Sequence, residues 1–522
     1  MINSNTVHYT PHLRTIFYVL IFLFSINGVA QNENYQYTLS FKGPAKNSYQ
    51  VKLKINKVKE TSLTLKMPSW MPGYYQLMNY ADQLQNMSVK DMKGNKIDFK
   101  KTKNNTWVLQ NTKNKSLVLE YEIITQRKFV ATSYVDASHA YIVNTNTFLY
   151  PDKQIQSPVS VKIIPNTAWK NVTTGLEKIE GKSNEFIAPN FDILYDSPFL
   201  IGNLRELPSF EVKGVKHRFI GYDMGTFNET DFIKKVKAIV ESASNIIGDI
   251  PYKEYTFIAI GPGRGGIEHL NNTTISFNGD GLNNPKGMNT MLNFLAHEYF
   301  HHYNVKRIRP FELGPFDYDK GSKTNLLWVS EGLSVYYEYL TVTRAGLKDE
   351  ATLLANIEAN INTHENNPGR LHQSLTQASF KTWKDGPFGA SGDDKNKSIS
   401  YYEKGPIIGM LLDFSIREAS QNKKSLDDVM RYLYWHYYKE LGRGFTDAEF
   451  EEACETIAGK SLTEVFEYVY TTKSIDYNSI LGAAGLEINM TNLNRKTKKF
   501  KIKKLEKATK LQTEILQSWL GK

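Results

Sequence analysis

The stretch that decides the fold is residues 288–304, MNTMLNFLAHEYFHHYN. Apolar residues recur in it at intervals of three and four, which is the period of an amphipathic α-helix. His297, Glu298 and His301 form a His-Glu-x-x-His motif within this pattern. Residues four apart share one helix face, so both imidazoles can bind one zinc ion while the glutamate lies beside it. The motif predicts a zinc site; the alternative is two ordinary histidines that cap or pack a helix.

A catalytic zinc ion takes three protein ligands and keeps one position for water. A second helical pattern begins at Trp328, and Glu331 in it follows His301 by 30 positions. This interval leaves room for a loop and a returning helix, so we expect Glu331 to be the third ligand of one zinc ion per chain. The alternative is that Glu331 caps its own helix behind Ser330. Glu298 is then the general base that activates the zinc-bound water.

The remaining sequence divides into two structural patterns. Short alternating stretches separated by turn residues run from Tyr35 to about Leu204 and predict a β-sandwich-like domain at 31–205. Strands and then helices predict an α+β catalytic domain with a helical lobe at 206–490. The expected strands are 255–261 and 274–277, and the expected helices are 232–247, 288–304, 325–342, 401–419 and 425–440. The chain is therefore expected to be a multidomain α+β protein.

The N-terminus has the order of features found in a secretory signal. Arg14 precedes the apolar run 16–24, and small residues lead to Ala30. The run is shorter than the roughly 20 apolar residues that a membrane span needs. We expect residues 1–30 to be a signal peptide and the protein to be periplasmic or secreted; the alternative is an uncleaved N-terminal anchor.

Charge and cysteine content exclude other classes of protein. The single cysteine, Cys454, allows no disulfide within the chain. Of the net charge of +10, residues 494–522 carry +8, so the body is nearly neutral and a nucleic-acid partner is not expected. We expect residues 491–522 to be a basic, solvated tail; weak contact with an anionic envelope surface is the alternative. Its end, LQTEILQSWL, has the spacing of a short docked helix. Oligomeric state is not predicted.

Several long motifs resemble one enzyme family. They are GGIEH (265–269), HEYFHHYNVKRIRP (297–310), PFDY (315–318), LLWVSEGLSVYYEYL (326–340), MPSWMPGYYQ (67–76) and DSPFLIG (196–202). Over about residues 35–490 the chain is similar to the glycyl aminopeptidase family, gluzincin peptidases with a thermolysin-like domain and usually a C-terminal PDZ domain. The resemblance implies a zinc aminopeptidase that removes Gly or Ala from peptides with a free N-terminus. About 30 residues follow Ile488, too few for a PDZ domain, so none is expected.

The resemblance also implies two further roles. Glu268, in the loop with Gly265 and Gly266, matches the glutamate that binds the substrate α-amine in related aminopeptidases. A carboxylate there pairs with an ammonium and sets the distance of one residue from the metal. Tyr402 matches the tyrosine that donates to the oxyanion. An ordinary strand-edge charge and a core aromatic are the respective alternatives.

Three rival functions fit parts of the sequence. Residues 261–266, GPGRGG, fit the G-x-G-x-x-G dinucleotide fingerprint, but that fingerprint must open a helix and the next residues have the pattern of a loop and a strand. A thermolysin-type endopeptidase is the enzymatic alternative; if a substrate with an acetylated N-terminus is cut as fast as the free amine, Glu268 does not have the role of amine ligand. A non-catalytic envelope binding protein with a structural zinc would have no use for Glu298.

Overall fold

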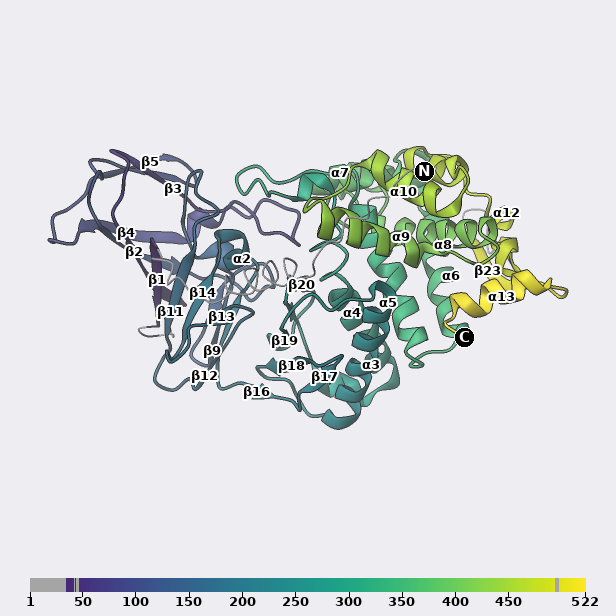
Figure 1. The fold of residues 1–522 in the computed structure, drawn as a ribbon, viewed down its shortest axis with the longest axis horizontal. Coiled ribbons are helices and arrows are strands. Elements are labelled where there is room, and N and C mark those ends of the chain that lie inside the picture. The colour runs from purple at the N-terminus through teal and green to yellow at the C-terminus, as the bar shows by residue number, and fades with distance from the viewer. Residues whose placement is uncertain (1–33, 42, 44–46, 493–496) are drawn as a thin grey trace, which may run out of the picture.

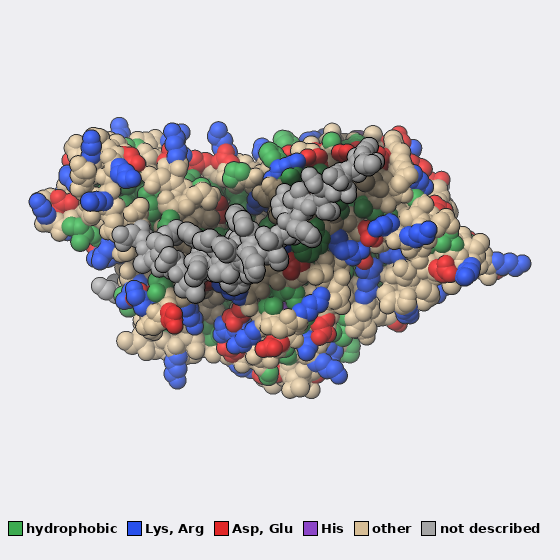
Figure 2. Space-filling model, viewed as in Figure 1, with side chains coloured by type: hydrophobic (Ala, Val, Ile, Leu, Met, Phe, Trp, Pro, Cys, Tyr) green, Lys and Arg blue, Asp and Glu red, His purple; other side chains and the backbone are tan. Residues whose placement is uncertain are grey.

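The computed structural model describes residues 34–41, 43, 47–492 and 497–522. The expected signal peptide, residues 1–30, lies outside the described residues. Within the described part of the chain, no helix combines the length and apolar character needed to cross a membrane. On the face shown in Figure 2, acidic and basic side chains are interspersed.

The N-terminal part is rich in β-structure, as expected, and lies at the left of Figure 1. One sheet contains, in spatial order, β13 (Glu177–Lys178), β14 (Glu185–Ala188), β11 (Val159–Ile164), β1 (Tyr35–Ser40), β2 (Ser48–Ile55), β7 (Leu117–Ile124) and β4 (Leu84–Asp91). A second contains β10 (Tyr150–Pro151), β3 (Leu63–Lys66), β6 (Thr106–Leu109) and β5 (Phe99–Lys103). A third contains β12 (Asn171–Thr173), β15 (Phe199–Gly202), β9 (His139–Ile142) and β8 (Tyr134–Val135).

Alternating side chains explain these sheets. In β1 every second residue is buried, which is the pattern of a strand with one face on a core. Buried side chains from all three sheets, among them Tyr37, Leu53, Leu65 and Ile142, belong to one apolar cluster. A short helix, α2 (Phe191–Tyr195), precedes β15 at the edge of this cluster.

A smaller mixed sheet follows and adjoins the helices. Its order is β16 (Arg205–Glu206), β18 (Val215–Gly221), β19 (Glu254–Ala259), β21 (Asn272–Ile275) and β20 (Gly266–Glu268), with β17 (Phe210–Val212) also paired to β18. Strands β18, β19 and β21 are parallel, and β20 runs antiparallel to β21 at the sheet edge. Helices α3 (Glu229–Ile247) and α4 (Pro285–Phe300) pack together beside it (Figure 1).

The remaining helices form the lobe at the right of Figure 1. They are α5 (Leu333–Arg344), α6 (Glu350–Asn366), α7 (Leu375–Asp385), α8 (Tyr401–Ala419), α9 (Leu426–Tyr432), α10 (Asp447–Ala458), α11 (Thr463–Tyr470) and α12 (Tyr477–Leu481). Helix α8 is buried over nearly its whole length, and α5, α6, α7, α10 and α11 all contact it. The expected fold class, a β-rich domain followed by a helical peptidase domain, is confirmed.

The C-terminal segment is packed on the helical lobe, which differs from the solvated tail that its charge suggested. Strands β22 (Leu486–Asn492) and β23 (Lys498–Lys504) pair, and β23 contacts α6. Helix α13 (Lys510–Trp519) buries Trp519, whose indole N–H donates to Tyr336 at 2.7 Å. Lys501 and Lys504 pair with Glu358 and Glu350, because α6 offers carboxylates to the basic strand.

Candidate active site

The two motif histidines meet a glutamate from the next helix. His297 lies in the last turn of α4 and His301 caps its C-terminus. The Nε2 atoms of His297 and His301 are 2.9 Å apart. Oε2 of Glu331 lies 3.3 Å from Nε2 of His301 and 3.7 Å from Nε2 of His297. All three side chains are buried. The structure therefore brings together the three residues expected to bind zinc.

Glu331 reaches this position through an irregular turn. Residues Trp328–Gly332 form a π-helical turn before α5, a feature that often marks functional sites. The side-chain amide of Asn304 donates to the Val329 carbonyl at 2.7 Å, which holds the turn. The backbone carbonyl of Asn304 in turn accepts a hydrogen bond from Nδ1 of His301 at 2.8 Å. One residue thus connects two of the three candidate ligands.

The chemistry of these donors fits zinc. A carbonyl only accepts, so Nδ1 of His301 carries a proton and donates it to Asn304, which leaves Nε2 as the ring nitrogen that can bind a metal. Nδ1 of His297 lies 3.2 Å from Oε2 of Glu338, a second carboxylate behind the imidazole. The Asn304 carbonyl is an outer hydrogen-bond partner of the kind that orients metal-bound histidines. Two histidines and a glutamate are a ligand set of catalytic zinc sites.

Glu298 lies beside the ligands and faces the edge strand. It is buried, and the Thr273 hydroxyl contacts its Oε2 at 3.5 Å. A Cβ atom placed on Gly266 of β20 would lie 2.7 Å from the Glu298 carboxyl carbon, so glycine permits the approach of strand and helix. The pKa of Glu298 is raised to about 7, mainly by burial and also by the nearby carboxylates of Glu268 and Glu331. His297 and His301 lower this pKa, but their effect is smaller. The carboxylate is therefore next to the ligands and desolvated.

Tyr402 lies on the other side of Glu331. Its hydroxyl donates to Oε2 of Glu331 at 2.9 Å. Helix α8 comes this close because two glycines meet: a Cβ on Gly405 would lie 2.5 Å from the Cα of Gly332. Burial, and then the Glu331 carboxylate, raise the pKa of Tyr402 well above its usual value. Its phenol is accordingly a hydrogen-bond donor at the site.

Glu268 is buried at the end of β20, and its Oε1 has no hydrogen-bond partner among the described residues. A loop of the N-terminal domain covers it: a Cβ on Gly73, whose φ is +93°, would lie 2.8 Å from Oε2 of Glu268. Tyr75 in the same loop is also buried. Burial, and then the carboxylates of Glu331 and Glu268, raise the pKa of the Tyr75 phenol well above its usual value. The N-terminal domain therefore forms one wall of the site.

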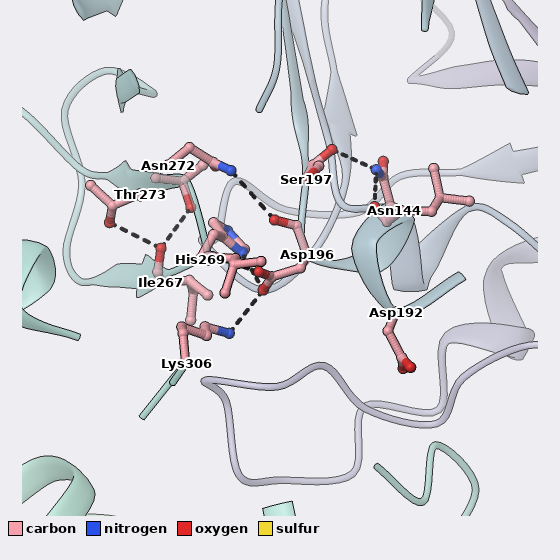
Figure 3. Close-up of polar contacts among 12 residues, drawn as sticks. Asn144, Asp192, Asp196, Ser197, Ile267, His269, Asn272, Thr273 and Lys306 are labelled. Atoms are coloured by element: carbon pink, nitrogen blue, oxygen red, sulfur yellow. Dashed lines mark hydrogen bonds and ion pairs between the residues drawn. The ribbon is translucent and has the colours of Figure 1, made fainter. Parts of the chain in front are cut away.

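A second contact from the N-terminal domain fixes the chain after Glu268 (Figure 3). Asp196, just after α2, accepts hydrogen bonds from the Leu270 N–H at 2.6 Å and the His269 Nδ1 at 3.1 Å. Its Oδ1 also pairs with Nζ of Lys306 at 2.8 Å. Burial opposes ionisation, but Lys306 and then His269 outweigh it and lower the pKa of Asp196 to about 2. Asp196 thus connects the residue after Glu268 to the segment after His301.

Sequence reasoning assigned no role to four residues that the structure places around the site: Gly73, Tyr75, Asp196 and Lys306. The signal was present, because MPSWMPGYYQ and DSPFLIG were among the motifs, and Lys306 follows the metal motif. Alternation and spacing do not reveal that these distant segments meet at one site.

Comparisons with known families agree with this geometry. Residues 36–203 match the Peptidase M61 N-terminal domain, and residues 290–408 match the M61 glycyl aminopeptidase family. A comparison with curated proteins finds no match.

Solved structures with the same architecture include an aminopeptidase N family protein from Idiomarina loihiensis. It is 24% identical, has a TM-score of 0.82, and the match covers 89% of this chain and 82% of that one. An M1 zinc metallopeptidase from Deinococcus radiodurans is 12% identical with a TM-score of 0.53, covering 85% and 94% of the two chains. A variant of that enzyme, bound to a Tyr-Ser-Ala substrate, gives a TM-score of 0.52 at 12% identity, covering 85% and 94%.

Proposed function

Because the chain belongs to the M61 glycyl aminopeptidase family, and is a zinc aminopeptidase in the general sense, we propose that it removes a small first residue, Gly or Ala, from peptides with a free α-amine. The observation that carries this proposal is Glu268. Its buried carboxylate has one oxygen without a hydrogen-bond partner in the described part of the chain, and it lies on the same strand as Gly266, which abuts Glu298. A substrate ammonium would satisfy that oxygen and place the next carbonyl at Glu298.

The walls around Glu268 support the proposed preference for a small first residue. Gly73 approaches the carboxylate so closely that even a methyl group on its Cα would collide with it. Tyr75 is buried in the same loop, and Trp70 behind it packs edge-on against Trp383 at 4.9 Å between ring centroids. Packed aromatic rings yield little space, so a large first side chain would be excluded.

The proposed roles follow the positions of the side chains. Zinc, held by His297, His301 and Glu331, would supply Lewis acidity that polarises a carbonyl and acidifies water. Glu298 takes the proton of the attacking water and passes it to the leaving amine. Tyr402 gives its O–H to the oxygen on which negative charge develops.

The test is an assay of the purified protein with glycyl and alanyl arylamides and their N-acetylated forms, with zinc content measured in parallel. We expect chelator-sensitive cleavage of the free amines alone. Glu298→Gln should keep its zinc and lose hydrolysis, whereas the matched variant Glu254→Gln, in β19, should keep both. Equal cleavage of acetylated substrates would show an endopeptidase and remove the proposed role of Glu268. Absence of zinc would refute the metal site.

We also propose that the protein is exported, on the strength of the apolar run 16–24 and the small residues up to Ala30. Mass spectrometry of the natural protein should find Gln31 as its first residue. A chain that starts at Met1 would instead indicate a retained N-terminal anchor.

A further inference from the structure

A cavity of about 640 Å³ lies next to the active site and has no role in the chemistry described so far. The loop that precedes β20 forms one side, with Arg264 and Gly265, and α4 forms the other, with Lys286, Met291 and Phe294. Phe294 connects it to the catalytic group, because its ring lies 2.9 Å from a Cβ built on Gly266, the position that also meets Glu298. Phe294 and the Glu298 carboxylate therefore both lie next to Gly266, so the cavity adjoins the catalytic carboxylate.

Strand β20 supplies a direction for the substrate. Within the described chain it pairs with β21 alone, so its other edge has no strand partner and its backbone groups there can pair with an extended peptide. Glu268 and Gly266 are two positions apart, so their side-chain positions face the same way, toward α4. A peptide whose ammonium is at Glu268 and whose first carbonyl is at Glu298 continues past Gly266. At about 3.3 Å per residue, its next residues reach Gly265 and Arg264.

The cavity offers two kinds of recognition. Its floor is apolar, since Leu282 is buried and Met291 and Phe294 are half-buried. Its rim carries two exposed cations, Arg264 and Lys286, and within the described chain neither side chain has an ion pair. An apolar pocket with unpaired cations at its mouth suits an apolar side chain followed by a carboxylate.

We propose that this cavity binds the part of the peptide beyond the cleaved bond, taking an apolar side chain on the floor and a carboxylate at Arg264 and Lys286. The proposal rests on the function proposed above, because Glu268 sets the direction of the peptide. It makes the enzyme selective for the residues that follow the first one. The carboxylate can be the C-terminus of a short peptide or an acidic side chain of a longer one.

The experiment compares four peptides with a free α-amine: Gly-Leu-Gly, its C-terminal amide, Gly-Leu-Asp amide and Gly-Gly-Gly. We expect kcat/KM for Gly-Leu-Gly to be about tenfold higher than for its C-terminal amide, which is the size of one charge-assisted contact. We also expect it to be about tenfold higher than for Gly-Gly-Gly, which is the size of one buried apolar side chain. Preference for the free acid alone identifies the C-terminus as the ligand. Cleavage of the Asp amide at the same rate identifies an acidic side chain.

Two variants test the residues. In the double variant Arg264→Gln/Lys286→Gln, the ratio of kcat/KM for Gly-Leu-Gly to kcat/KM for its amide should fall close to one. Lys234 is an exposed lysine on α3, and the control variant Lys234→Gln should leave this ratio at about ten. Calorimetry with the Glu298→Gln protein provides a readout without turnover: Leu-Gly should bind about tenfold more tightly than its amide. If glycyl arylamides are cleaved but acid and amide do not differ, this inference is wrong and the proposed function stands. If no free amine is cleaved, the proposed function itself has failed.

Discussion

Replacing Asp196 with Asn tests whether the N-terminal domain positions the active site. The substitution keeps the size of the side chain but removes the charge that Lys306 and His269 face. Lys306 is nearly buried, so it would remain as a cation without a carboxylate partner. The chain after Glu268 would lose an anchor at the Leu270 N–H.

The magnitude follows from the pKa of Asp196, which is about 2 rather than the ordinary 3.8. A difference of nearly two pKa units corresponds to about 2 kcal/mol of folding free energy at neutral pH. Because the folded pKa is depressed, this stability is present above about pH 4 and disappears as the pH falls through about 2. We expect the Asn variant to unfold at a lower temperature at pH 7 and the difference to shrink below pH 4.

The assay is thermal unfolding across pH, together with kinetics on glycyl arylamides. Asp98→Asn is the matched control, because Asp98 is exposed and, among the residues that the structure describes, its carboxylate has an ion pair with Lys96 alone, at 4.0 Å. We expect Asp196→Asn to raise KM for free amines more than it lowers kcat, because Glu268 loses its position and the metal ligands do not. Unchanged stability between pH 5 and 8 would refute the electrostatic reasoning. Lower stability with unchanged KM would show that Asp196 stabilises the domain contact without positioning Glu268.

Three further substitutions have defined outcomes. Tyr402→Phe should lower kcat by about a hundredfold, because the donor to the developing oxyanion is lost. Zinc should still bind, because all three ligands remain although Glu331 loses its hydrogen bond from Tyr402. Unchanged kcat would contradict the proposed role. Gly405→Ala should cost about 1–3 kcal/mol of stability and reduce activity, because the added methyl group would meet the backbone of Gly332. Gly346→Ala is the exposed control. It should keep activity, although the φ of +70° at Gly346 makes alanine cost some stability there. Trp519→Ala should cost about 3–5 kcal/mol in chemical denaturation by emptying the contact with Tyr336, and a loss below 1 kcal/mol would show a loosely attached C-terminal helix.

The C-terminal segment shows where composition misleads. Ten basic residues in 494–522 suggested a solvated tail, yet β23 and α13 pack on the helical lobe. The apolar spacing of LQTEILQSWL did predict a docked helix, and Trp519 is fully buried. Net charge averages over both faces of an element, whereas docking depends on one face and on the carboxylates that α6 presents to β23.

The sequence by itself determined the local part of the site. His297, Glu298 and His301 lie within five consecutive residues of one helix, so helical geometry alone brings them together. The fold class was also predictable, because the change from alternating to helical spacing is a local property of the chain.

Only the tertiary structure decided the long-range parts. Glu331 meets the histidines through a π-helical turn held by Asn304, and Tyr402 meets Glu331 because two glycines let α8 approach. Asp196 reaches Lys306 across 110 positions. Contacts of this kind depend on how packed elements come together in three dimensions, and neither residue type nor periodicity along the chain encodes that distance.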